Sequence, residues 1–139
     1  MTAIKPLNWV PTAGIGYTVV RRADGGMHFI FTSDDLATLK HWRDFAMQHL
    51  YDSDRLTRNL YDLRALTNLS NEAIRYALEP TGDPAARNLR VATVVANDAV
   101  KSALERIAAL TSPTGIDLRI FTELESAEEW LSQPLEQII

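Results

Sequence analysis

The residues from position 62 to 71 carry the most suggestive chemistry in the chain. Asp62 and Arg64 follow a run of strand-forming residues, and open α/β sheets bind ligands at the carboxyl ends of their parallel strands. One interpretation is therefore that Asp62 and Arg64 line a ligand crevice. The alternative is a surface ion pair that closes the loop and contributes under ~1 kcal/mol. We favour this second interpretation, because position alone is a weak argument for a ligand site.

Three polar residues, Thr67, Ser70 and Asn71, lie at the start of a predicted helix. A phosphate on Thr67 or Ser70 would meet free backbone N–H groups and the positive end of the helix dipole. A phosphorylation or partner-binding loop at these three residues is thus one hypothesis. The simpler interpretation is that Ser70 or Asn68 caps the helix, which is the ordinary use of such side chains.

The histidines do not have the spacing of a metal site. His41 and His49 are eight residues apart, whereas a helix places two imidazoles on one metal when they are about four apart. We expect both to be solvated. His28 alternates with Phe29 and Phe31 and is expected on the opposite face of its strand, without a role. We expect no metal site and no cofactor.

Catalytic and nucleotide-binding motifs are absent from the sequence. The glycines match neither G-x-G-x-x-G nor the Walker spacing, there is no G-x-S-x-G elbow, and the chain has no cysteine to act as a thiolate. We therefore predict that the protein is not an enzyme. Arg21, Arg22, Arg55 and Arg58 would form a small basic patch only if the first and third strands were neighbours, and solvated strand ends are the simpler account.

Hydrophobic spacing predicts the elements that position these residues. Two strands at 17–22 and 27–32 flank Asp24-Gly25-Gly26, which is a hairpin signal. Ser33, Asp34 and Asp35 offer caps for a helix to about residue 51. Its expected apolar stripe comprises Leu36, Leu39, Trp42, Ala46 and Leu50.

The second half of the chain alternates strands and helices. A strand at 58–63 precedes a helix that we expect to end at Pro80. The apolar run 89–96 is typical of a strand that is buried on both faces. We expect this strand at the centre of the sheet. A helix from about 98 to 111 follows, with Asn97 or Asp98 as its cap. A strand at 118–121 leads to a short helix that begins with a capping box of Ser126 and Glu129.

The predicted fold class is therefore α/β. The order β-β-α-β-α-β-α-β-α implies a mixed, mostly parallel five-stranded sheet with about four helices, opening with a β-hairpin. Residues 1–16 contain prolines and glycines with little periodicity and are expected to form an N-terminal arm. Residues 17–139 are expected to form a single domain.

Three segments carry a family resemblance: 59–64 (NLYDLR), 90–98 (RVATVVAND), and 119–121 (RIF) with Ala127, Trp130 and Leu131. Together with the element order, they resemble the STAS group, within it the sporulation anti-sigma-factor-antagonist-like bacterial proteins. The resemblance spans about Tyr17 to Leu131. It implies a STAS-like fold and a regulatory, protein-binding role.

The resemblance also implies a phosphorylated serine in an Asp-Ser-Ser-Gly-like motif, modified by a partner kinase. The corresponding residues in this chain are Ser70-Asn71-Glu72-Ala73, so Asn71 stands where that serine would be. The family's phospho-switch is not carried over to this chain.

Composition limits the classes of partner. The chain has 139 residues, a net charge of -4 and no cysteine. The acidic balance argues against nucleic acid, and neither a membrane span nor a secretion signal is recognisable. We expect a cytoplasmic, non-catalytic regulatory module that binds another protein. The alternative is a carrier or sensor for an apolar or anionic small molecule in a sheet–helix crevice. The apolar tail with Leu135, Ile138 and Ile139 also suggests a homodimer, unless it is a frayed terminus.

Overall fold

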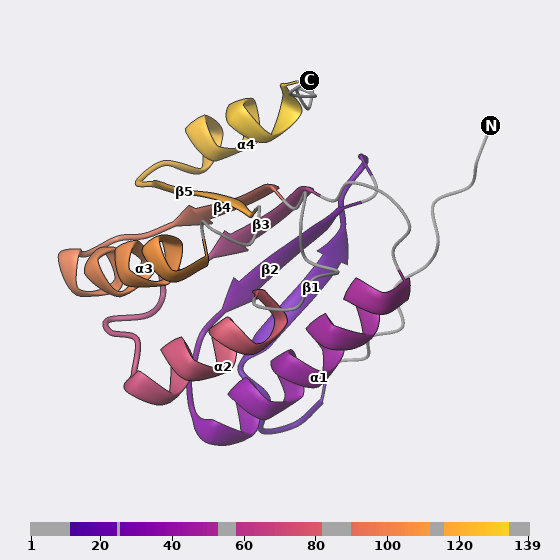
Figure 1. Cartoon of the computed structure of the whole chain (residues 1–139), viewed down its shortest axis with the longest axis vertical. Coiled ribbons are helices and arrows are strands. Elements are labelled where there is room, and N and C mark those ends of the chain that lie inside the picture. The colour runs from indigo at the N-terminus through magenta and orange to yellow at the C-terminus, as the bar shows by residue number, and fades with distance from the viewer. Residues whose placement is uncertain (1–11, 25, 53–57, 82–89, 112–115, 134–139) are drawn as a thin grey trace.

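The computed structural model shows a five-stranded sheet with helices on both of its faces (Figure 1). It describes residues 12–24, 26–52, 58–81, 90–111 and 116–133. The strands are β1 Tyr17–Arg21, β2 Met27–Phe31, β3 Arg58–Asp62, β4 Arg90–Val94 and β5 Asp117–Phe121. The helices are α1 Leu36–Asp52, α2 Asn71–Thr81, α3 Asp98–Thr111 and α4 Leu124–Ser132.

The strands follow one another across the sheet in chain order. β1 pairs antiparallel with β2, and the remaining neighbours are parallel. This confirms the predicted mixed α/β sheet that opens with a hairpin. The middle strand is β3, so the expectation that residues 89–96 form the centre was wrong by one strand. β4 is nevertheless buried on both faces, because α4 lies on one side of it and α3 on the other.

The main core lies between the sheet and the three helices α1, α2 and α3 (Figure 1). Alternate residues of the hairpin strands enter it, since successive side chains of a strand point to opposite faces. Its aromatic centre includes Phe29 and Tyr61, whose rings stack with centroids 4.4 Å apart. The indole N–H of Trp42 donates to the hydroxyl of Tyr61 at 3.2 Å, and burial raises the pKa of that hydroxyl.

The opposite face of the sheet, here called the α4 face, is covered by one helix (Figure 1). Ala127, Trp130 and Leu131 of α4 pack on Leu60 of β3 and on Ala92 and Val94 of β4. This core is smaller than the first one. Among the described helices, α4 alone packs on this face, and it covers β3, β4 and β5.

The start of α1 differs from the predicted stripe. Asp35 is the cap, since its carboxylate accepts the N–H of Thr38 at 2.9 Å. Leu36, the first predicted core residue, is half exposed, whereas Leu39 and Trp42 are buried as expected and Phe45 joins them. Leu36 is the first helical residue and therefore lies at the rim of the helix, beyond the sheet that it would have to contact.

Two helix ends also differ from expectation. The helix α2 includes Pro80 and ends one residue after it, at Thr81. Proline disrupts a helix interior, and here a single helical residue follows it. The helix α4 begins at Leu124 with Glu123 as its N-cap residue, and Glu123 makes no capping side-chain bond. Ser126 lies within the first turn, so the predicted capping box of Ser126 and Glu129 was wrong. Packing of Leu124 against the smaller core extends the helix to this earlier start.

Glycine is required at the tip of the hairpin. A side chain on Gly26 would place its Cβ 1.6 Å from the carbonyl oxygen of Arg58. The missing side chain therefore lets the β1–β2 turn lie directly against the start of β3. This contact sets the position of the hairpin relative to the rest of the sheet.

Candidate functional site

Asp62 and Arg64 form a closed ion pair at the carboxyl end of β3. The guanidinium of Arg64 donates through Nε to Oδ1 at 2.9 Å and through Nη2 to Oδ2 at 2.7 Å. These bonds lower the pKa of Asp62, while burial opposes them. The side chain of Asp62 is 11% exposed and that of Arg64 is 45% exposed. Both carboxylate oxygens are thus engaged, and the arginine is the half of the pair that solvent reaches.

Ser70 caps α2. Its hydroxyl oxygen accepts the backbone N–H of Ala73 at 3.1 Å, which is the ordinary capping geometry. Its own backbone N–H donates to the carboxylate of Asp34 at 2.9 Å. Thr67 and Asn71 are exposed. Sequence reasoning had placed Asp34 among the caps of α1, and the structure shows instead that it holds the start of α2.

The two predicted sites lie on different sides of the sheet. Asp62 follows Leu60 by two residues and therefore shares the α4 face with it. Ser70 begins α2, which belongs to the opposite layer. The structure does not bring the charged pair and the helix start together into one site.

A strip of the α4 face over β1 and β2 forms a surface that the sequence did not reveal. We call Thr18, Val20, His28 and Ile30 the open strip. The strand register pairs Val20 with His28 and Thr18 with Ile30, and His28 lies beside Leu60. Val20 is 57% exposed and Ile30 is 39% exposed. Alternation predicted only that His28 faces away from Phe29 and Phe31, and it is the position of α4 that leaves this strip uncovered by the described helices.

A hollow of about 470 Å³ adjoins the open strip between the hairpin turn and α4. The residues that line it come from β1, the turn, β2, β3 and α4. They are Val20, Arg21, Arg22, Ala23, Asp24, His28, Arg58, Glu128 and Ser132. Sequence reasoning had considered Arg21, Arg22 and Arg58 as a patch if β1 and β3 were neighbours. β2 separates these strands, yet the three arginines still line one hollow. Arg55 lies outside the described residues.

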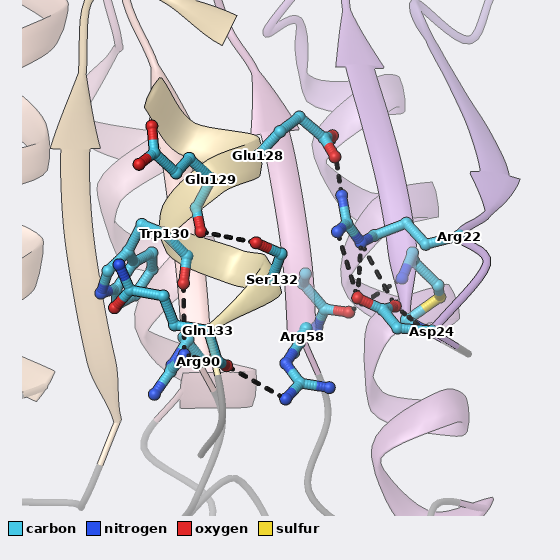
Figure 2. Close-up of polar contacts among 12 residues, drawn as sticks. Arg22, Asp24, Arg58, Arg90, Glu128, Glu129, Trp130, Ser132 and Gln133 are labelled. Carbon is cyan, nitrogen blue, oxygen red and sulfur yellow. Dashed lines mark hydrogen bonds and ion pairs between the residues drawn. The ribbon is translucent and has the colours of Figure 1, made fainter. Parts of the chain in front are cut away.

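Polar contacts around this hollow hold α4 on the sheet, as Figure 2 shows. Arg22 binds Asp24 at 3.1 Å and Glu128 of α4 at 2.8 Å. Arg58 and Arg90 donate to the carbonyl of Gln133 at 3.2 Å and 3.0 Å. Cations at the carboxyl end of a helix stabilise its free carbonyls and its dipole. The arginines of β3 and β4 therefore fix the end of α4.

His28 lies between two charged pairs on the α4 face. Burial is the largest influence on its pKa, which is lowered from 6.5. The carboxylates of Glu128 and Asp62 act in the opposite direction, and the guanidinium groups of Arg22 and Arg64 add to the lowering. The imidazole is therefore held neutral at pH 7.

The other histidine of interest, His41, is not simply solvated as expected. Its Nδ1 lies 2.7 Å from the hydroxyl of Tyr17 in a hydrogen bond, and the two rings meet edge to face. This contact ties α1 to β1. The side chain of His49 lies outside the described residues.

No metal site is found among the described residues, since no three histidine or carboxylate side chains gather there to hold an ion. In the same part of the chain, every helix is too short or too polar to cross a membrane. The apolar tail with Leu135, Ile138 and Ile139 lies outside the described residues. The chain matches no protein-family model, no curated protein and no solved structure.

Proposed function

We propose that this protein is a non-catalytic regulatory or protein-interaction module of STAS-like type, and that a helix of its partner binds on the open strip. The observation that carries the proposal is the uncovered apolar surface formed by Val20 and Ile30 beside α4. Exposed apolar side chains that gather on one sheet face indicate an interaction surface.

The dimensions of the sheet favour a helix as the occupant. Neighbouring strands are about 4.8 Å apart, and a helix with its side chains is about 10 Å wide. One helix therefore covers about two strands. α4 packs on β3, β4 and β5, and no other helix of the described residues lies on this face (Figure 1). Within the described part of the chain, β1 and β2 therefore leave room for one more helix in the same layer, with its apolar face on Val20 and Ile30.

The margin of the open strip adds a polar contact. Asp62 lies beside Ile30 in the strand register, and its partner Arg64 is 45% exposed. An acidic side chain on the incoming helix would meet Arg64 without the burial of an unpaired charge. The predicted ligand pair thus becomes part of a protein interface in this proposal.

The family resemblance supports the same class of function. The segments 59–64 and 90–98 that carry it form β3 and β4 and the turns after them, and regulation by protein binding is what it implies. Fold and function are separate questions, so the partner has to be found by experiment. The lack of cysteine suits a reducing compartment, and we place the module in the cytoplasm.

Site-specific photo-crosslinking tests the proposal. Benzoylphenylalanine is incorporated at Val20 in the full chain, expressed in its source cells, and crosslinked products are identified by mass spectrometry. The matched control is Leu110 of α3, which is 60% exposed against 57% for Val20. We expect one discrete protein adduct from position 20 and none of the same mass from position 110.

Purified components then test whether the adduct reflects binding at the open strip. Ile30→Asp should weaken binding of the identified partner at least about tenfold, since it places a charge in an apolar contact, whereas Leu110→Asp should leave the affinity unchanged. If the crosslinked species is a second copy of this chain, the open strip is a homodimer interface and does not bind a helix of another protein. Equal adducts from positions 20 and 110, or an unaffected Ile30→Asp variant, would contradict the proposal.

A further inference from the structure

The hollow beside the open strip has the size and the walls of a small-ligand site. Its volume of about 470 Å³ falls within the range of small-molecule pockets, roughly 300 to 1,000 Å³. Apolar contact is available from Val20 and Ala23, and polar groups converge on it from the hairpin, β3 and α4. Such a combination of an apolar wall and a few polar groups is typical of ligand recognition.

One charged side chain on the walls, that of Arg58, remains available to an anion. The hollow is lined by Arg22 and Arg58 and by two carboxylate residues, Asp24 and Glu128. Arg21 also borders it, but the register pairs Arg21 with Met27, so its side chain belongs to the opposite face of the sheet. Both carboxylates bind Arg22, whose side chain is only 10% exposed. Arg58 forms no ion pair with any described residue and donates instead to the carbonyl of Gln133. The formal charges on the walls balance, and the guanidinium of Arg58 is the group with which an anion would pair.

Two nitrogen atoms on these walls lack hydrogen-bond partners. Nε of Arg58 and Nε2 of His28 are both buried and unpaired in the described part of the chain. Arg58 uses Nη2 for the carbonyl of Gln133, which leaves its Nε–H unused. Buried polar groups are nearly always paired with protein, water or an ion. Two such atoms on one hollow indicate a group that would pair with them.

We propose that this hollow binds the oxyanion group, phosphate or carboxylate, of a small molecule, with Arg58 and His28 as its ligand-binding residues. The guanidinium of Arg58 supplies the charge, and the imidazole of His28 supplies a second donor. Both nitrogen atoms are buried in the structure, so binding requires side chains around the hollow to move. This site goes beyond the proposed interaction function, because it does not require a protein partner.

Titration calorimetry with two probes, inorganic phosphate and citrate, tests the proposal on the full chain. Sodium chloride at matched ionic strength is the control for screening. We expect saturable binding of at least one probe, and the stronger of the two identifies phosphate or carboxylate as the preferred group. Arg58→Gln should weaken that binding at least about tenfold, because it removes a charge-assisted hydrogen bond.

Two further variants separate binding from folding. Arg58→Gln also removes a hydrogen bond to Gln133. We therefore use His28→Gln as a second variant, since His28 forms no hydrogen bond to α4 among the described residues. We expect it to weaken binding as well. Arg119→Gln, which removes a half-exposed guanidinium paired with Asp117 on β5, should leave binding unchanged.

Nuclear magnetic resonance gives a readout that a purely structural role would not produce. A bound anion should raise the pKa of His28, since it stabilises the imidazolium. The proposal would be overturned if the wild type showed no saturable binding, or if Arg58→Gln and His28→Gln bound the anion as tightly as the wild type does. Variants at Ile30 that abolish partner binding would leave anion binding intact, so the two proposals can fail separately.

Discussion

The carboxylate of Asp34 accepts a hydrogen bond from the backbone nitrogen of Ser70 at 2.9 Å. This bond joins the segment before α1 to the first residue before α2, 36 positions later in the chain. The hydroxyl of Ser70 meanwhile accepts the N–H of Ala73. A negative charge introduced on Ser70 would therefore lie beside the carboxylate of Asp34.

Substitution of Ser70 should reveal this repulsion. Ser70→Asn and Ser70→Asp both retain a capping oxygen, but only the aspartate adds a charge next to Asp34. We expect Ser70→Asp to be less stable than Ser70→Asn by roughly 1 kcal/mol at pH 7, as measured by urea unfolding. In the background of Asp34→Asn the two variants should become equal. A difference that persists in that background would show that Asp34 is not its source.

The ion pairs of Arg22 should contribute unequally to the attachment of α4. Glu128 is 44% exposed, so we expect Glu128→Gln to cost less than ~1 kcal/mol of unfolding free energy. Arg22→Ala should cost more, about 1–3 kcal/mol, because it also removes a buried stem and leaves Asp24 without its partner. Denaturant unfolding followed by circular dichroism measures both. Equal losses would indicate that the stem of Arg22 does not contribute.

His28 should make stability depend on pH. Its pKa in the folded protein is lowered from 6.5 by burial, so the folded state favours the neutral imidazole. The resulting contribution to stability is fully present above about pH 6.5 and is lost as the pH falls through the lowered value. Glutamine cannot titrate, so His28→Gln should flatten the decline of stability below pH 6.5. Parallel stability curves for wild type and variant would contradict this expectation.

Gly26 should tolerate no side chain. Gly26→Ala would bring a Cβ within 1.6 Å of the carbonyl oxygen of Arg58, so the turn would have to move away from β3. We expect a destabilisation of more than about 2 kcal/mol, with loss of hairpin protection in hydrogen exchange. Ala23, in the same turn and on the wall of the hollow, serves as a control: Ala23→Gly should cost less than ~1 kcal/mol.

Local features of the chain could be predicted from the sequence alone. Alternation in β2 separated Met27, Phe29 and Phe31 from His28 and Ile30, because a strand's period of two is independent of its neighbours. The spacing of Val100, Leu104 and Ile107 likewise indicated α3, and all three are buried. Capping by Ser70 and by Asn97, which accepts the N–H of Val100, follows from nearby backbone alone.

Errors arose where packing extended or shortened an element. The start of α4 at Leu124 and the exposure of Leu36 depend on which surface lies opposite each helix end. Propensity and capping patterns contain no information about that surface. The hydrogen bond between His41 and Tyr17 was missed for the same reason, since its two residues are 24 positions apart.

By itself, the sequence determined the order of the elements and the alternating faces of the strands, because these depend on residues close in the chain. The mixed sheet followed from that order, because strands that alternate with helices pair in parallel through right-handed crossovers. Only the tertiary structure decided that α4 lies over β3, β4 and β5, and that Val20 and Ile30 remain open beside it. It also decided that Arg22, Arg58 and His28 line one hollow. These juxtapositions depend on strand order and on helix placement, which arise from the packing of segments far apart in the sequence.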